Sequence, residues 1–131
     1  MTTELYRDQF GVITHDAKQG VLELTWFETT ESMSDQDFKV WLQRYAELGE
    51  AHRPAFMVID AQAFRHRFSA ELAAWRDQHI IPRYNAAGVS KLAFLLPKQA
   101  RPSTPPTTEG AANFPTGYFD TRKGMTAWFG S

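Results

Sequence analysis

The stretch Ala55-Phe56-Met57-Val58-Ile59-Asp60 decides the fold. An unbroken apolar run that ends at a carboxylate is typical of a strand buried on both faces. A basic loop follows, and then Ser69 is a good N-cap for a helix over 70–79, with Glu71 in its first turn. The run 91–96, Lys91 to Leu96, is a second unbroken apolar strand. Together these segments predict a βαβ unit whose two strands are adjacent and parallel, with a right-handed crossover.

The residues before this unit predict a β-hairpin. Segment 5–14 has apolar residues at alternate places, which predicts a first strand. Segment 21–27 has the same period of two and predicts a half-buried second strand. Its inward residues are Leu22, Leu24 and Trp26. The turn between the strands ends at Gly20, a residue that accepts a positive φ.

An amphipathic helix is expected to begin after Ser34. Ser34 is a good cap, and Asp35 and Asp37 lie at the positive end of the helix dipole. The apolar stripe at helical spacing consists of Phe38, Trp41, Leu42, Tyr45 and Leu48. The pattern favours core packing over a cofactor wall. Gly49 and Pro54 bracket the end of this helix.

The second helix is expected to place Leu72, Trp75 and His79 on one face, with His79 as a hydrogen-bonded core histidine. Pro82 interrupts this helix because it lacks a backbone donor, and Gly88 closes the segment that follows. Across the fold, the side chains predicted to be buried are Trp41, Val58, Ile59, Trp75, Phe94 and Trp128.

The C-terminal part begins with a long exposed loop. Segment 97–113 contains three prolines within 101–110 and has no periodicity. Segment 114–119 is expected to form a short edge strand. Asp120 is then expected to cap a last helix. The residues of that helix predicted to face the core are Met125, Trp128 and Phe129.

Composition indicates one globular domain over residues 1–131. The chain is 43% hydrophobic and 14% aromatic, which suits a compact core. A net charge of -1 gives no general attraction to nucleic acid. The absence of cysteine excludes disulfides and sulfur-ligated metal. With no signal peptide and no apolar run of membrane length, the expected compartment is the cytoplasm, and an integral membrane protein is not expected.

The order of elements resembles the STAS fold, and more closely its SpoIIAA-like branch, which is related in shape to the lipid-binding Sec14-like domains. The segments that carry the resemblance are 20–26, 33–35, 56–60, Trp75 with Pro82, 87–94 and 127–129. The resemblance implies an α/β domain with a mixed sheet of about four to five strands, an N-terminal hairpin, parallel central strands and covering helices. In the anti-sigma-factor antagonists of that family, a phosphorylatable serine begins the helix after the buried strand, and Ser69 has the matching position. Here the turn is Arg67-Phe68-Ser69-Ala70, where the antagonists have an Asp-Ser-Ser-Gly type of turn.

The candidate site follows the buried strand. Asp60 ends that strand at the edge where open α/β sheets usually bind ligands, although the alternative is that it caps a loop or pairs with Arg65 or Arg67. Arg65-His66-Arg67 precedes a helix N-terminus, which favours an anion. The partner- or anion-binding residues predicted are Asp60, Arg65, His66, Arg67 and Ser69. The four histidines have no metal-chelating spacing, and Ser69 lacks the setting of a nucleophilic serine, so no metal, cofactor or catalytic residue is predicted.

Three functions remain in view. The first is a non-enzymatic binding or regulatory module that recognises a protein partner through residues 61–72. The second is a carrier or sensor of a small lipophilic or anionic ligand, which a pocket beside Trp75 and Trp41 would favour. The third, an enzyme that uses Asp60 and His66, ranks last because its geometry has to be assumed. A homodimer is left open, and Arg83 and Tyr84 are candidates for a pocket entrance.

Overall fold

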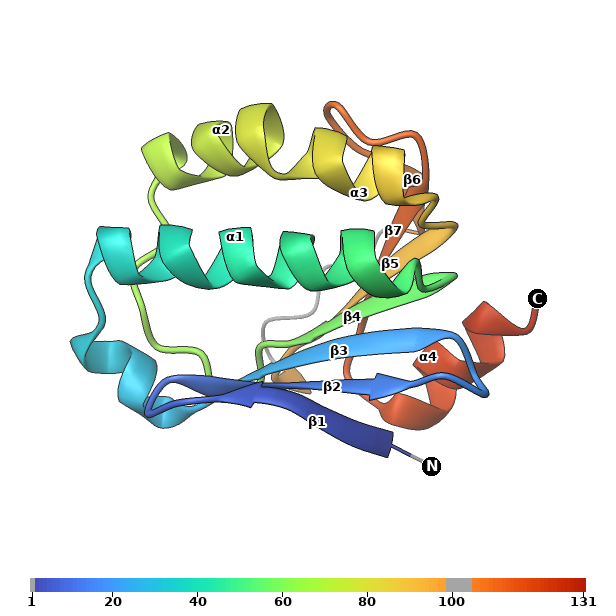
Figure 1. The fold of residues 1–131 in the computed structure, drawn as a ribbon, viewed down its shortest axis with the longest axis horizontal. Helices are drawn as coiled ribbons and strands as arrows, with labels where there is room; N and C mark the ends of the chain where they lie inside the picture. The colour runs from blue at the N-terminus through green and yellow to red at the C-terminus, as the bar shows by residue number, and fades with distance from the viewer. Residues whose placement is uncertain (1, 99–104) are drawn as a thin grey trace.

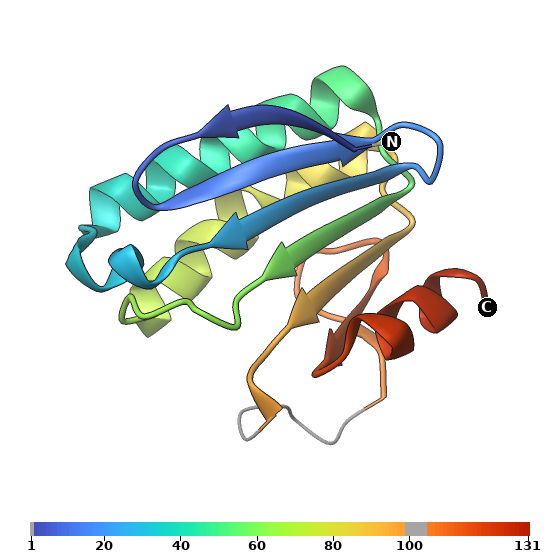
Figure 2. The same cartoon turned by 90° about the horizontal axis from the view of Figure 1, so that it is seen from below.

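The computed structural model describes residues 2–98 and 105–131. Within these residues the chain forms one mixed sheet of seven strands in the order β1-β2-β3-β4-β5-β7-β6 (Figures 1 and 2). The strands are β1 (Thr2–Arg7), β2 (Gly11–Asp16), β3 (Val21–Trp26), β4 (Phe56–Asp60), β5 (Lys91–Leu95), β6 (Thr107–Thr108) and β7 (Pro115–Phe119). The α/β class with a mixed sheet is therefore as the sequence predicts.

The helices divide the sheet into two unlike faces. They are the 3-10 helix η1 (Glu28–Ser32), α1 (Asp35–His52), α2 (Ala70–His79), α3 (Ile81–Ala87) and α4 (Arg122–Phe129). Helices α1, α2 and α3 lie over one face, which we call the helix-covered face, and α4 lies on the other, the open face (Figure 1). Seen from below, α4 covers only the β5 and β7 end of the open face and leaves β1 to β3 bare (Figure 2).

The prediction that the two central strands are adjacent and parallel is confirmed. β4 and β5 are parallel, with Val58 opposite Ala93 and Ile59 opposite Phe94. β3 pairs with β4 and β7 with β5, both also parallel, so β4 and β5 have neighbours on both sides. This explains the unbroken apolar runs, since both faces of these strands are covered.

The N-terminal prediction is wrong in one respect, and the sheet has more strands than the four to five expected. The single strand predicted over 5–14 is two antiparallel strands, β1 and β2. The backbone N–H of Phe10 donates to the Asp8 carboxylate over 2.8 Å, and the N–H of Asp8 donates to the carbonyl of Gly11. An aspartate turn therefore folds the chain back without a glycine at its tip. The two-residue β6 adds a further strand outside β7, so β7 is not an edge strand as predicted.

The helix ends follow local chemistry. Ser34 and Asp37 form a capping box at the start of α1, as the serine cap predicts. α2 ends at His79, α3 carries Pro82 in its first turn, and Gly88 caps it at a φ of 82°. The last helix is not capped by Asp120, because the Thr121 hydroxyl accepts from the N–H of Gly124 instead. Part of the predicted 97–113 loop, residues 99–104, lies outside the described residues.

Burial corrects several predictions about single side chains. Trp41, Val58 and Ile59 are buried as expected. Trp75, Phe94 and Trp128 are only half-buried, and His79 is exposed and not a core histidine. The cause for α2 is its position, since Leu72 alone is buried on that helix and Trp75 packs at its margin under the Lys39 ammonium. Tyr84, a candidate for a pocket entrance in the sequence, is fully buried.

Candidate functional site

A pocket opens at the carboxyl end of β4 and β5, under α1 and α2. Its volume is about 260 Å³. We call it the aromatic pocket, and it is lined by Trp26, Phe38, Leu42, Ile59, Ala61, Phe64, Phe68, Arg76, Phe94, Leu96 and Tyr118. This is the edge of a parallel sheet where open α/β folds bind ligands. The mostly apolar wall with one cation is the composition expected of a small-molecule site.

The loop after β4 builds one side of this pocket. The N–H of Ala61 donates to the carbonyl of Leu95 over 2.8 Å, which continues the pairing of the two strands beyond β4. The N–H of Arg65 donates over 2.8 Å to the hydroxyl of Thr30, a fully buried residue of η1. His66 hydrogen-bonds to Asp35 at 2.8 Å. These contacts fold the loop over the start of α1 and bring its two phenylalanines to the pocket.

Aromatic rings pack against one another around the pocket. Phe38 of α1 stacks with Trp26 at a centroid distance of 5.8 Å, and its ring lies 5.6 Å from Phe68 and 6.0 Å from Phe64. Phe38 and Trp26 are buried, whereas Phe68 is 40% exposed at the rim. The inner wall is therefore shielded from solvent, and the rim is formed by a ring that solvent reaches.

Arg76 is the charged residue in this apolar wall. Its guanidinium carbon lies 4.9 Å from the Phe68 ring centroid and 5.9 Å from that of Phe94. Its Nε is buried without a hydrogen-bond partner, and Arg76 forms no ion pair with any of the described residues. Leaving a buried donor without an acceptor costs about 1–3 kcal/mol. A cation kept in this state within a pocket is a marker of an anion-binding position.

Two carboxylates that line a hollow together with Arg76, those of Asp77 and Glu109, are bound to other donors. The Tyr118 hydroxyl donates to Glu109 over 2.7 Å, and the N–H of Ala111 donates to Asp77 over 2.8 Å. Burial, and then the hydrogen bond to Glu109, raise the pKa of Tyr118 well above its ordinary value. Tyr118 therefore stays neutral and adds no charge beside Arg76.

The structure does not gather the five residues predicted from the sequence into one cluster. Asp60 lies on the open face, where it accepts from Arg122 at 3.3 Å and from the N–H of Gln62 at 3.1 Å. Of the two alternatives for Asp60, the loop cap is found in this bond from Gln62, whereas a pairing with Arg65 or Arg67 is not found among the described residues. The Arg65 guanidinium lies 3.9 Å from Glu28.

The other predicted residues have local roles. His66 is held by Asp35, and the Ser69 hydroxyl accepts from the N–H of Leu72 as the cap of α2. Arg67 is exposed. Sequence reasoning pointed to the loop that borders the aromatic pocket but missed Phe64, Phe68 and Arg76 as residues of its wall. Two phenylalanines around a basic triplet, and an arginine four residues after the buried Leu72, were the available signals.

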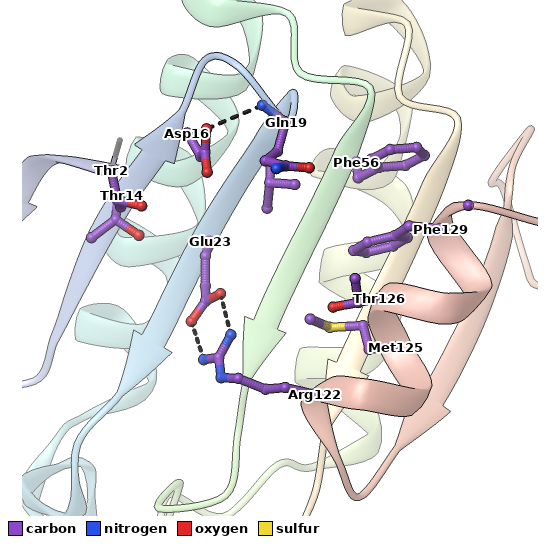
Figure 3. Close-up of a pocket in the computed structure, with 12 residues that line it drawn as sticks. Thr2, Thr14, Asp16, Gln19, Glu23, Phe56, Arg122, Met125, Thr126 and Phe129 are labelled. Carbon is purple, nitrogen blue, oxygen red and sulfur yellow. Dashed lines mark hydrogen bonds and ion pairs between the residues drawn. The ribbon is translucent and has the colours of Figure 1, made fainter.

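A larger groove of about 590 Å³ lies on the open face beside α4 (Figure 3). The guanidinium of Arg122 reaches from α4 to Glu23 on β3, with two hydrogen bonds of 2.9 and 2.5 Å (Figure 3). The stacked rings of Phe56 and Phe129, 4.5 Å apart, close its other side. The central charge of this groove is already neutralised by its own neighbours, so the groove offers a ligand less than Arg76 does.

Two further absences concern the described residues, 2–98 and 105–131. No helix in them is both long and apolar enough to cross a membrane. No group of three or more histidine or acidic side chains in them is arranged to hold a metal ion. Comparison with known proteins found no family model, no curated protein and no solved structure that matches the chain. The function therefore has to be inferred from the geometry of the site.

Proposed function

We propose that the chain is a non-enzymatic binding module that holds a small, largely apolar ligand in the aromatic pocket. The single observation that carries this proposal is the pocket of about 260 Å³ with aromatic walls at the carboxyl edge of the parallel strands. The loop and helix start at 61–72, which the sequence indicates as the recognition surface, then form the rim of this site. The carrier or sensor function, which the sequence analysis put second, is therefore our first candidate.

Recognition of a protein partner through the same rim is the second candidate. Phe68 is 40% exposed beside the exposed Arg67, and such an aromatic residue next to an arginine suits an interface. We rank it below ligand binding because one exposed ring is a small contact area. The enzyme reading has less support still, because Asp60 and His66 are each engaged by another residue.

For the finer fold we propose a SpoIIAA-like domain of the STAS and Sec14-like group. The N-terminal hairpin, the parallel strands β3, β4 and β5 and the covering helices support it. The added strands β1 and β6 are departures from the expected four to five strands. A cytoplasmic location is part of the same proposal.

The test of ligand binding is to fill the pocket. Ala61 lines it, whereas Ala63, two residues along the same loop, does not. We expect the neutral probe 4-phenylbutan-1-ol to bind the parent and Ala63→Phe alike in isothermal titration calorimetry, and at least tenfold more weakly to Ala61→Phe. Circular dichroism checks that both variants are folded. Equal binding by a folded Ala61→Phe variant would place the ligand elsewhere.

A further inference from the structure

The aromatic pocket contains a cation that no described side chain neutralises. Arg76 is held against the faces of Phe68 and Phe94, so its flat faces are covered by rings. Its Nε edge is buried and has no hydrogen-bond partner. The donors that remain lie in the plane of the guanidinium, which is where a carboxylate accepts two parallel hydrogen bonds.

We propose that the ligand of the aromatic pocket is an amphipathic monocarboxylate, with its carboxylate paired to Arg76 and its apolar body against the wall that Phe38 and Phe64 help to form. This inference rests on the proposed function and adds the chemical class of the ligand. An aromatic or short aliphatic acid fits the two parts of the wall. The rings meet the apolar body, and the guanidinium meets the acid group.

No carboxylate among the described residues neutralises Arg76, because the nearby ones accept hydrogen bonds from other groups. Arg76 also lines a neighbouring hollow of about 200 Å³ that contains Asp77 and Glu109. Asp77 accepts the N–H of Ala111, and Glu109 accepts the hydroxyl of Tyr118. Neither carboxylate lies within ion-pair distance of Arg76. The anion that completes Arg76 therefore has to come from outside these residues.

The charge balance favours a single negative charge over a phosphate dianion. Arg76 is the one cation among the residues that line the pocket in the described part of the chain. A second negative charge would lack a counter-ion in a site of low dielectric constant. Glu109 lies in the adjoining hollow and would repel it. A carboxylate leaves the site neutral.

The experiment compares matched ligands that differ only in the head group. 4-Phenylbutanoate and 4-phenylbutan-1-ol share the same carbon skeleton, and 3-phenylpropyl phosphate supplies a dianion. Isothermal titration calorimetry is run at pH 7 on the parent and on Arg76→Gln. Arg44→Gln is the control, since Arg44 also stacks on a ring, that of Tyr6 at 4.3 Å, but does not line the pocket.

We expect the parent and Arg44→Gln to bind the acid at least tenfold more tightly than the alcohol. Arg76→Gln should lose this preference and keep its affinity for the alcohol within twofold. Arg76→Lys, which keeps the charge but loses the planar fork, should retain only part of the preference. An Arg76→Gln profile that still favours the acid tenfold would overturn the inference.

The remaining outcomes separate the inference from the proposed function. Equal binding of acid and alcohol by the parent overturns the carboxylate while the pocket stands. Tighter binding of the phosphate than of the acid overturns the choice of a monoanion. If the parent binds neither the alcohol nor the acid, the proposed function is overturned together with the inference.

Discussion

The two faces of the sheet each hold an arginine near the carboxyl end of the parallel strands, but in opposite states. On the open face, Arg122 makes a two-bond pair with Glu23 and a further contact with Asp60. On the helix-covered face, Arg76 lies among aromatic rings and its Nε has no acceptor. The first arginine fastens α4 to the sheet, and the second is left with unused donors.

This difference indicates which of the two pockets is the better candidate for a ligand site. The open-face groove is more than twice as large as the aromatic pocket, yet the cation at its centre, Arg122, is already paired with Glu23 and Asp60. A ligand there would compete with an existing ion pair, whereas a ligand beside Arg76 would supply a missing acceptor. A buried donor without an acceptor is therefore a better indication of a ligand site than the volume of a pocket.

The largest expected effect concerns the stability of the two faces. Phe38 is 4% exposed and is part of the helix-covered core, so Phe38→Ala should cost about 3–5 kcal/mol. Phe129 is half-buried on the open face, and Phe129→Ala should cost roughly 1 kcal/mol, about half of what full burial contributes. Urea unfolding followed by circular dichroism measures both. Equal losses would mean that the open face is as tightly packed as the other.

A second experiment tests the two arginines directly. Arg122→Met leaves the nearly buried Asp60 and Glu23 without their cation, so we expect a loss of about 1–2 kcal/mol in the free energy of unfolding at pH 7. Arg76→Met removes no ion pair among the described residues and relieves an unpaired donor, so stability should stay within about 0.5 kcal/mol or rise. The measurement is chemical denaturation without ligand. A larger loss from Arg76→Met than from Arg122→Met would reverse the comparison.

More of the fold than of the candidate site could be predicted from the sequence. The strands at 56–60 and 91–95 were predictable because strands covered on both faces leave unbroken apolar runs. The turn at Asp8 was missed because its two tip residues, Gln9 and Phe10, are neither glycine nor proline and because it depends on a side-chain hydrogen bond. The loop after β4 was predictable from the carboxyl-edge rule. Arg76 was not, because its role depends on Phe68 and Phe94, which only the tertiary fold brings to it.

A smaller effect is expected from a histidine pair on the helix-covered face. The rings of His15 and His52 lie 4.6 Å apart. Burial, and then the charge of His52, lower the pKa of His15 below its ordinary value of 6.5, while Asp16 opposes the shift. The unfolded chain then binds the proton more readily than the folded chain. The contribution of neutral His15 to the free energy of unfolding is therefore fully present above about pH 6.5, and it is lost as the pH falls through the folded-state pKa.

The corresponding measurement is urea unfolding of the parent and of His15→Phe at pH 7.5 and 5.5. The parent should lose more stability than the variant on this acidification, because the variant keeps a ring against His52 but has no proton to bind. Parallel losses in the two proteins would show that His15 does not contribute to the pH dependence.

The smallest effect is expected from the two arginines that the sequence singled out. Arg65 and Arg67 are exposed, and the contact of Arg65 with Glu28 at 3.9 Å is a weak surface pair. The double substitution Arg65→Ala with Arg67→Ala should change the free energy of unfolding by less than about 0.5 kcal/mol. It should also leave the affinity for 4-phenylbutanoate within twofold of the parent, because neither arginine lines the aromatic pocket. Calorimetry on the double variant and on Arg76→Gln decides whether the acid group binds at Arg76 in the pocket or at the exposed arginines of the loop. If the double variant loses the preference for the acid and Arg76→Gln keeps it, the anion binds at the basic loop, as the sequence indicates, and the aromatic pocket holds at most the apolar part of the ligand.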